Sequence, residues 1–510
     1  MSAANPFLQR TPLPQARALL LAGVTPVGSE ELAVDDACGR VVAQDVLAQH
    51  PTPHYRASAM DGLAVRASDT WEATESSVLL RTVSADATPP SQDTPSCVVV
   101  DTGALLPDWT DAVVRIEDAV AEADGYRIRS VVAPGRDVRR AGEDIEAATL
   151  LLPNGSTIRP ADLGAMLATG VTRIRVRRAP RVAILATGAE VVEPQQGARA
   201  GQVIEYNSRM IAAMVEQWGG QAHRLGIVAD DEASLKSAVR DAARRFDVVA
   251  VVAGSSAGRK DFTVAVLASV GELLVQGVDM APGRPVALAR AGHSVSPEAN
   301  RRTPVIAVPG YPVAAVVVCE QFLRPLLCAL LGCSEPVAPT LRARIVRKIP
   351  SRLGMEEFRR VCLVRQLDED YSVALLPSGA GSISTVTGAH GWLRIAPSVE
   401  GLDADAIVNV ELRVSLAEIE AALVVASGPC AATAMLERRL RDDDRLARVA
   451  TLGLGPDDAL AAVERGEAHG ALVASGQSLP ATLRAHALPD GEGLVLAVRP
   501  DSLAQLRLGL

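Results

Sequence analysis

The sequence predicts a multidomain protein in which a doubly wound α/β domain is combined with smaller β domains. Apolar strands and amphipathic helices alternate over residues 181–330, as in a parallel sheet covered by helices. Short valine-rich runs, separated by Pro, Gly, Asp and Ser, fill residues 51–139 and return at 336–415. The length of 510 residues suits about three or four domains.

Composition narrows the class of protein. The chain is 48% hydrophobic and 22% charged, which allows large cores and argues against global disorder. Its net charge of -9 argues against a non-specific nucleic-acid binder. The seven cysteines form no CxxC pair, so neither a zinc site nor a disulfide framework is expected.

Neither the N-terminus nor the apolar run at 304–333 is typical of a membrane segment. Residues 1–10 have no apolar leader, and prolines break the apolar run at 304–333. A buried strand followed by a core helix explains that run better than a membrane span. We therefore expect a cytoplasmic protein with no membrane and no nucleic-acid partner.

The first part of the chain predicts an inserted domain. Residues 11–50 and 140–180 are expected to form one discontinuous helical linker domain, with helix around 161–168. The valine-rich residues 51–139 are then a β domain inserted between its two halves.

The α/β domain over 181–330 is predicted from the order of its elements. Strands are expected at 182–185, 221–227, 248–252, 273–278 and 305–308, and helices at 208–218, 232–245 and 263–269.

Two further domains follow. Five short strands between residues 341 and 412 predict a compact β-barrel domain over 336–415. Residues 421–510 alternate strand and helix again, which predicts a small α/β extension.

Two small-residue loops are the strongest candidates for a site. Thr187-Gly188-Ala189-Glu190 follows the first strand of the α/β domain, and residues 253–261, which end in Asp261, follow the third. Open parallel sheets bind ligands at the carboxyl ends of their strands. Small residues let backbone N–H groups approach an anion, and a nearby carboxylate suits a hard cation such as Mg²⁺.

Other motifs are less specific when each is taken alone. An ordinary turn or a rigid connector would explain each of five further segments: Ser58–Gly62, Asp101–Ala104, 135–145, Met280–Pro285 and Val308–Pro312.

Taken together, their order resembles that of a known family. Residues 53–66, Pro-His-Tyr-Arg-Ala-Ser-Ala-Met-Asp-Gly-Leu-Ala-Val-Arg, resemble the start of the β domain in the MoeA/gephyrin family, the molybdopterin molybdenumtransferases. Further matching segments follow in the family's order at 101–118, 134–160, 182–207, 248–262, 279–285 and 305–316. The resemblance covers roughly residues 11 to 415.

This resemblance implies an elongated homodimer of four structural parts. Its site would lie in the α/β domain and be completed by the last β domain of the other subunit. The activity implied is molybdenum cofactor biosynthesis: adenylylated molybdopterin and molybdate are the substrates, and AMP is released in a reaction that uses Mg²⁺. A cofactor-receiving enzyme is then a possible partner.

The resemblance also assigns residues. It implies catalytic roles for Asp61, Glu190, Asp230 and Asp261, with Glu190 and Asp261 holding the metal. The substrate-binding positions that it implies are Thr102, Asp144, Thr187, Gly188, Gly254, Ser256, Gly258, Arg284, Pro309, Gly310 and Arg360.

Departures from the family pattern keep an alternative open. Ala189 replaces an Asp, Ala281 and Arg284 replace lysines, and Tyr311 replaces an Asn. The alternative is a non-catalytic molybdopterin-binding or cofactor-delivery protein whose extension docks a partner. The sequence does not distinguish molybdenum from tungsten.

The extension is similar to part of the periplasmic-binding-protein-like module that is fused to some family members. A complete module needs two lobes, and the residues after 421 suffice for one. We therefore expect a single α/β unit that packs on itself and is joined flexibly to the barrel, with His469 at its surface. Deleting it should leave the remaining fold intact.

Overall fold

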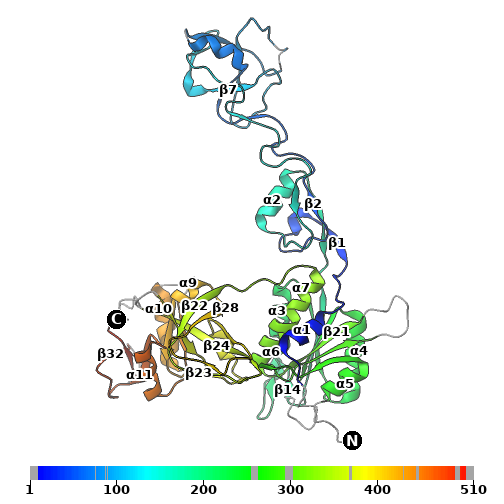
Figure 1. Cartoon of the computed structure of the whole chain (residues 1–510), viewed down its shortest axis with the longest axis vertical. Helices are drawn as coiled ribbons and strands as arrows, with labels where there is room; N and C mark the ends of the chain where they lie inside the picture. The colour runs from blue at the N-terminus through cyan, green and yellow to red at the C-terminus, as the bar shows by residue number, and fades with distance from the viewer. Residues whose placement is uncertain are drawn as a thin grey trace. The chain divides into compact units, whose positions relative to one another are not determined.

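The structure is a computed structural model, and it describes residues 10–74, 76–86, 88, 90–253, 262–292, 302–366, 370–428, 430–443, 447–488 and 494–500. The chain divides into two compact units (Figure 1). One contains the described residues up to Thr25, then Ala179–Leu330 and the chain from Ser334 onward. The other contains Pro26–Arg178 with Leu331–Cys333.

A six-stranded sheet forms the centre of the α/β domain, in the order β16-β13-β17-β21-β20-β18. Strands β16, β13, β17 and β21 are parallel, whereas β20 is antiparallel to both of its neighbours. The bounds are β13 (Arg181–Thr187), β16 (Gln221–Val228), β17 (Val248–Ala253), β18 (Gly271–Gln276), β20 (Ala287–Ala291) and β21 (Thr303–Pro309). The strand β20 is not among those that the sequence predicts.

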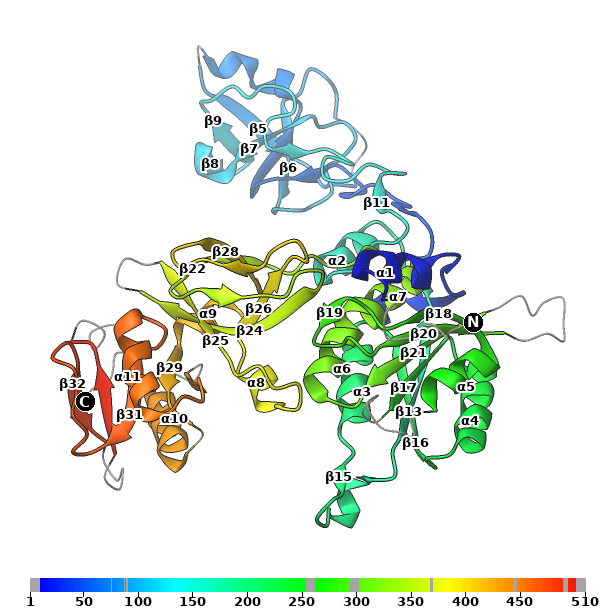
Figure 2. The same cartoon turned by 60° about the horizontal axis from the view of Figure 1, so that its bottom comes forward.

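Helices cover both faces of this sheet, which confirms the doubly wound prediction (Figure 2). Helices α4 (Glu232–Arg245) and α5 (Thr263–Val270) pack together over buried residues such as Leu185, Val239 and Val251. Helices α3 (Asn207–Gln217) and α6 (Pro312–Val318) contact each other as well as strands β13 and β21 respectively.

Residues Pro312–Leu331 form one long apolar helix, made of α6, the π-helical turn η6 (Cys319–Leu323) and α7 (Arg324–Leu331). Among the described helices it is the one that is long and apolar enough to cross a membrane, with a mean hydropathy of 1.8. However, 78% of that apolar window is buried inside the protein. It is the core helix that the sequence predicts after residue 304.

The linker region differs from the expected helical unit. Helix α1 (Leu13–Leu21) lies with the α/β domain, where Arg290 Nη2 donates to the Leu19 carbonyl at 2.8 Å. The segment that follows forms strands instead of helix: β1 (Ser29–Ala33) pairs with β12 (Arg173–Arg177), and β2 (Val46–Leu47) pairs with β11 (Leu150–Leu152). Helix α2 (Pro160–Ala168) is the one that the sequence predicts there. The two halves do meet, but through strand pairing.

The inserted β domain contains a sheet in the order β7-β4-β6-β5-β9-β8. Its core includes Leu63, Leu80, Cys97 and Val114, all nearly inaccessible to solvent. The strands are β4 (Gly62–Val65), β5 (Val78–Thr82), β6 (Ser96–Val100), β7 (Ala112–Arg115), β8 (Ala119–Glu122) and β9 (Gly125–Ile128).

The second β domain is the predicted barrel. Its strands follow the order β24-β25-β22-β28-β26, and pairing of β24 with β26 closes the ring. The bounds are β22 (Thr340–Ile345), β24 (Glu356–Arg365), β25 (Tyr371–Leu375), β26 (Gly391–Ile395) and β28 (Ile407–Leu412). The short strand β19 (Met280–Ala281) of the preceding domain pairs with β24 and connects the two domains.

The extension after residue 421 is one α/β unit, as expected. Its sheet has the order β30-β29-β31-β33-β32. The elements are β29 (Ala422–Ala426), α10 (Ala431–Asp443), β30 (Arg448–Thr451), α11 (Pro456–Arg465), β31 (Gly470–Ala474), β32 (Arg484–Ala487) and β33 (Leu494–Val498).

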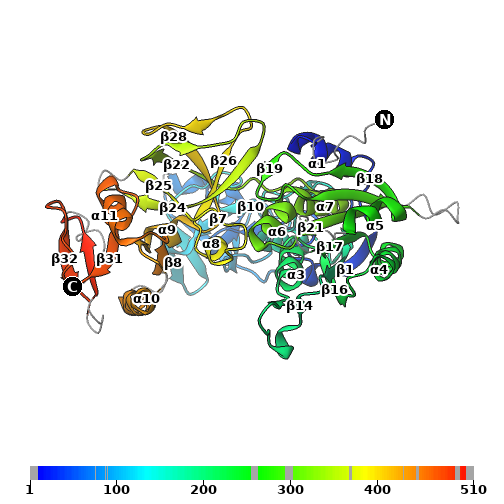
Figure 3. The same ribbon diagram turned by 90° about the horizontal axis from the view of Figure 1, so that it is seen from below.

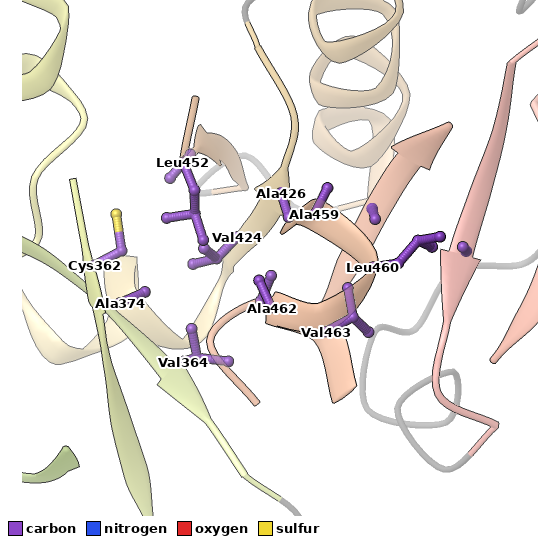
Figure 4. Packing of buried hydrophobic residues seen from close by; sticks show 14 of the residues in the cluster. Cys362, Val364, Ala374, Val424, Ala426, Leu452, Ala459, Leu460, Ala462 and Val463 are labelled. Carbon is purple, nitrogen blue, oxygen red and sulfur yellow. The ribbon is translucent and has the colours of Figure 1, made fainter. Parts of the chain in front are cut away.

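Contrary to the expectation of a flexible attachment, the extension shares a hydrophobic core with the barrel (Figure 4). The barrel contributes Cys362, Val364, Ala374, Leu376 and Ala389, and the extension contributes residues that include Val424, Ala426, Leu452, Ala462 and Val463. His469 is also buried and accepts a hydrogen bond from the backbone N–H of Val424 at 2.9 Å, so its expected place at the surface is wrong. The small side chains on both sides allow the backbones to pack closely.

Candidate active site

The parallel strands of the α/β domain bring the predicted loops to one edge. Thr187 at the end of β13 is in register with Val228 of β16. Ala253 at the end of β17 is in register with Pro309 of β21. The segments that begin after these residues therefore emerge at the same edge, which is where open α/β sheets bind ligands.

A cavity of about 370 Å³ opens at this edge. Its walls come from the ends of three strands, from the segment that leads into α3, and from the barrel. The lining residues are Ala186, Thr187, Glu190, Val191, Val203, Ile204, Glu205, Tyr206, Asn207, Val252, Ala253, Gly310, Tyr311, Pro312 and Gly381.

Several predicted site residues meet here. Thr187, Glu190 and Gly310 line the cavity, and Gly188 and Pro309 are their neighbours in the chain. Asp230 follows the end of β16 at the same edge and is exposed. Four predicted residues, Gly254, Ser256, Gly258 and Asp261, lie outside the described residues.

Gly188 allows the Glu190 carboxylate to lie close to the backbone. Its φ is +143°, and a Cβ there would lie 2.8 Å from Val191 Cγ2 and about 3.2–3.3 Å from both Glu190 carboxylate oxygens. A side chain at Gly188 would therefore displace Glu190. The glycine of this motif serves the position of the carboxylate that follows it.

Two buried polar atoms on the cavity lining have no hydrogen-bond partner among the described residues. Asn207 Nδ2 donates to the Gly310 carbonyl at 2.6 Å, which connects the start of α3 to the end of β21. Within the described chain the Asn207 Oδ1 atom and the Thr187 hydroxyl remain unpaired, although both residues are buried. Unpaired buried polar atoms are rare, and a ligand site is a common place to find them.

The start of α3 is fixed by a carboxylate that sequence reasoning missed. Glu205 is 4% exposed and accepts hydrogen bonds from the Ser208 backbone N–H at 2.7 Å and the Ser208 hydroxyl at 2.6 Å. Arg209 pairs with Glu205 at 2.8 Å and with Glu193 at 2.6 Å. The signal was present in the sequence, because an acidic residue three positions before a Ser near a helix start can satisfy unpaired N–H groups.

The barrel contributes one wall of the cavity within the same chain. The backbone N–H of Val313 at the start of α6 donates to the Ala380 carbonyl at 3.1 Å, and Gly381 lines the cavity. In Figures 2 and 3 the neighbouring helix α8 (Ser384–Thr387) lies next to α6. The resemblance implied that the barrel of the other subunit completes the site, whereas this segment reaches the cavity of its own chain.

Arg360 is buried in the barrel, where it donates hydrogen bonds to the segment that precedes Ala380 and Gly381. Its Nη1 and Nη2 atoms donate to the carbonyls of Gly379 at 3.0 Å and Pro377 at 2.8 Å. Burial, with a smaller contribution from Arg359, lowers the pKa of Arg360 to about 10. Direct binding of substrate by Arg360, in its own or the other subunit, stays a prediction.

In the other unit, Asp61 and Thr102 come together at the edge of the β domain. The Thr102 backbone N–H and hydroxyl donate to the same Asp61 oxygen, at 2.6 and 2.7 Å. These bonds hold the pKa of the exposed Asp61 carboxyl below its usual value, and the bond from the hydroxyl has the larger effect. The nearby Arg115–Asp137 pair, at 2.9 Å, adds a second charged group to this edge.

Two predicted residues are not placed in a cluster of described site residues. Asp144 is exposed in the β-domain unit, and its backbone N–H donates to the Thr52 carbonyl at 3.2 Å. Arg284 is half-buried in the turn before β20, where its carbonyl accepts from Val278, and it is not among the cavity-lining residues. Their roles in substrate binding stay predictions.

The cavity is lined by oxygen atoms that could bind a metal ion, but the described part of the chain contains no preformed set of metal ligands there. No group of three or more His, Cys, Asp or Glu side chains gathers there in a metal-binding arrangement. Two carboxylates line the cavity. Glu205 accepts hydrogen bonds from Ser208 and forms an ion pair with Arg209, whereas no such bond from a described residue to the Glu190 carboxylate is present.

Comparison with known families agrees with this arrangement. Residues 11–170 match the MoeA N-terminal region (domain I and II), and residues 183–329 match the probable molybdopterin binding domain. The matches stop before the barrel and the extension.

Alignments with individual relatives cover most of the length of each relative. A molybdopterin molybdenumtransferase 2 of Mycobacterium tuberculosis is 32% identical over 374 residues, which are 71% of this chain and 90% of the relative. A molybdopterin molybdenumtransferase of Haemophilus influenzae is 29% identical, over 68% of this chain and 85% of its own.

Solved structures give the same result. A molybdopterin biosynthesis MoeA protein of Pyrococcus horikoshii has a TM-score of 0.69 at 29% identity, and the match covers 80% of this chain and all of that one. A second structure of MoeA protein from the same organism has a TM-score of 0.65 at 26% identity.

Proposed function

The chain belongs to the MoeA family of molybdopterin molybdenumtransferases and acts in molybdenum cofactor biosynthesis, and from this premise we propose that it inserts molybdate into adenylylated molybdopterin and releases AMP. The observation that carries the proposal is the cavity at the strand ends of the molybdopterin-binding domain. There Thr187 and Glu190 line the cavity, and the lack of a side chain at Gly188 leaves room for the Glu190 carboxylate.

In this proposal, different residues at this edge bind the phosphates, orient the reacting oxygens and balance the negative charge. In the sequence small residues follow β13 and β17, and small residues in such loops allow backbone N–H groups to bind phosphate oxygens. Glu190, Asp230 and Asp261 are the carboxylates that hold and orient the reacting oxygens. Arg284 is suited to pair with a phosphate or with the molybdate oxyanion because a guanidinium binds two oxygens at once. An oxygen from water or from molybdate attacks the AMP phosphorus as the bond between the two phosphates breaks, so that AMP leaves and molybdopterin keeps its own phosphate.

Mg²⁺ fits this donor set as an ion shared with the substrate. It prefers oxygen ligands and is usually held by one or two carboxylates together with phosphates and water. Glu190 at the cavity and Asp261 are the two carboxylates that would hold it. When bound, the ion would neutralise negative charge on the phosphates.

We also propose a cytoplasmic homodimer that passes its product to a cofactor-receiving enzyme. Light scattering of the purified protein measures its mass in solution. A mass of twice 53.3 kDa supports the dimer, and a mass of 53.3 kDa, that of one chain, contradicts it.

The second candidate is a non-catalytic molybdopterin-binding or delivery protein. It is favoured by Ala189 and Ala281, which remove charges at two motif positions, and by Tyr311, whose half-exposed ring lines the cavity. An added aromatic ring in a binding cavity increases contact area without adding catalytic chemistry.

One assay separates the two candidates. Purified protein is incubated with adenylylated molybdopterin, molybdate and Mg²⁺, and AMP is measured. We expect wild-type turnover, and a loss of at least about a hundred-fold in Glu190→Gln and in Asp261→Asn, with molybdopterin binding retained in both. Molybdopterin binding by the wild type without any release of AMP would support the delivery protein instead.

A further inference from the structure

The extension after residue 421 lies outside both family-model matches, as the barrel does. None of its described residues lines the cavity, yet it is not a separate module, because it shares a core with the barrel. The two residues that flank the barrel segment 377–388 belong to that core.

Both ends of this segment leave the barrel from the shared core. Leu376 precedes it and Ala389 follows it, and both are buried members of the core. The opposite side of the core is formed by the extension, including Val424 and Leu452 (Figure 4). The base of the segment is therefore packed between barrel and extension.

One turn of the extension touches the segment directly. Gly453 follows Leu452 with a φ of +64°, and a Cβ there would lie 3.1 Å from Pro377 Cγ. The Gly453 backbone N–H donates to the Ser427 carbonyl at 2.9 Å, which fixes the turn to the end of β29. Pro377 thus lies beside the Gly453 turn, and Arg360 Nη2 donates to the Pro377 carbonyl.

A buried polar contact connects the same two domains. The Gly466 carbonyl of the extension accepts from Gln366 Nε2 at 3.0 Å and from the Ser372 hydroxyl at 2.5 Å. Glu467 is 2% exposed and pairs with Arg347 of the barrel at 2.9 Å. Partners at fixed distances on both sides allow little relative movement of the two domains.

The tip of the segment reaches the cavity. Ala380 accepts the hydrogen bond from the Val313 N–H, and Gly381 lines the cavity next to the ring of Tyr311. The chain of contacts therefore runs from the Gly453 turn through Pro377 to Gly381.

We infer that the extension is a positioning element for the substrate cavity: its Gly453 turn supports Pro377 and so keeps residues 379–381 against the start of α6. This inference rests on the proposed function, because it assigns the extension a part in binding the molybdopterin substrate. A complete second lobe is not needed for this role.

The test changes the contact and leaves the cavity residues unaltered. Gly453→Ala places a methyl group against Pro377. Gly476→Ala is the matched control, since Gly476 also lies in the extension with a positive φ of +123°, but no described atom lies within 4 Å of the place its methyl group would take. Each variant is compared with wild type by hydrogen exchange at the Val313 amide and by equilibrium binding of molybdopterin.

We expect the Val313 amide to exchange about five-fold faster in Gly453→Ala, since local opening sets exchange rates, and molybdopterin to bind several-fold more weakly. Adding Pro377→Ala should restore part of both values, because residues in contact are energetically coupled. Gly476→Ala should leave both values as in the wild type, even if it melts at a lower temperature.

Unchanged exchange and binding in Gly453→Ala would overturn the inference and leave the extension a purely stabilising role. The exchange measurement needs no substrate, so it is independent of the proposed function. If exchange responds as expected but no variant, including wild type, binds molybdopterin, the positioning contact is supported and the proposed function is the part that fails.

Discussion

Thr102 donates two hydrogen bonds to one oxygen of Asp61, one from its backbone and one from its hydroxyl. The two residues are 41 positions apart, and pairing of β4 with β6 brings their strands together. The carboxylate is therefore held in its charged form at a fixed place on the surface of the β domain.

Replacing Thr102 by Val tests this arrangement. Val keeps the shape of Thr but removes the hydroxyl bond, which is the largest cause of the lowered pKa of Asp61. We expect that pKa to rise toward its ordinary value, measured by NMR titration of the carboxyl carbon. If Asp61 is catalytic, AMP release should fall about ten-fold. Thr102→Ser keeps the hydroxyl and should keep both values.

A second prediction concerns Gly188→Ala. The added methyl group would lie 2.8 Å from Val191 Cγ2 and in contact with the Glu190 carboxylate. We expect Glu190 to move and AMP release to fall at least about ten-fold, since small displacements of reacting groups are costly. Gly197→Ala is the control, because Gly197 has a positive φ and no close neighbour among the described residues. Equal activity in the two variants would argue against a role for Glu190.

These two sites show how far sequence reasoning reaches. The loops after β13 and β21 could be predicted because a parallel sheet brings strand ends to one edge whatever the loop details. Asn207 was not predicted, since its role depends on where α3 begins relative to Gly310, a contact that is set by tertiary packing and leaves no regular spacing. Glu205 was not predicted either, although its position three residues before Ser208 is a local signal in the sequence.

The strand pairing of the linker and the firm attachment of the extension to the barrel were missed for related reasons. Residues 29–33 form a strand because they pair with 173–177, a partner more than a hundred positions away, and local helix propensity does not decide such a segment. In the extension, alternation of strand and helix predicted the elements correctly. It did not reveal that the small residues at Ala374 and Ala462 complete one core across two domains.

The third prediction is loss of stability in mild acid. His390 and His469 are buried, and burial lowers the pKa of each to about 4 from an ordinary value of 6.5. Each Nδ1 atom accepts a backbone hydrogen bond, from Leu363 and Val424 respectively, so both rings are held neutral. As the pH falls, the unfolded chain binds protons first, and stability is lost between about pH 6.5 and 4.

The expected loss is about 1.4 kcal/mol per histidine at pH 5.5 and approaches about 3 kcal/mol at pH 4. Urea unfolding between pH 7.5 and 4.5 measures it. In His469→Gln the slope of stability against pH should become shallower, although the variant starts from lower stability at pH 7.5. An unchanged slope in that variant would contradict the assignment.

The last prediction reverses the expectation drawn from the sequence alone. Deleting residues 421–510 should leave a barrel that aggregates, because Val364, Ala374 and Leu376 would lose the apolar partners that now cover them. Gln366 and Ser372 would lose the Gly466 carbonyl as well. A contiguous exposed apolar patch on a sheet is a common cause of association.

A point variant separates this effect from the loss of a whole domain. Leu452 is 1% exposed in the shared core, and Leu452→Ala should lower the free energy of unfolding by about 2–5 kcal/mol. Met435→Ala, at an exposed position on α10, should change it by no more than about 0.5 kcal/mol. A truncated protein that stays monodisperse, with a melting temperature like that of the full chain, would show that the barrel does not depend on the extension. The shared core would then be a contact that the extension needs and the barrel does not.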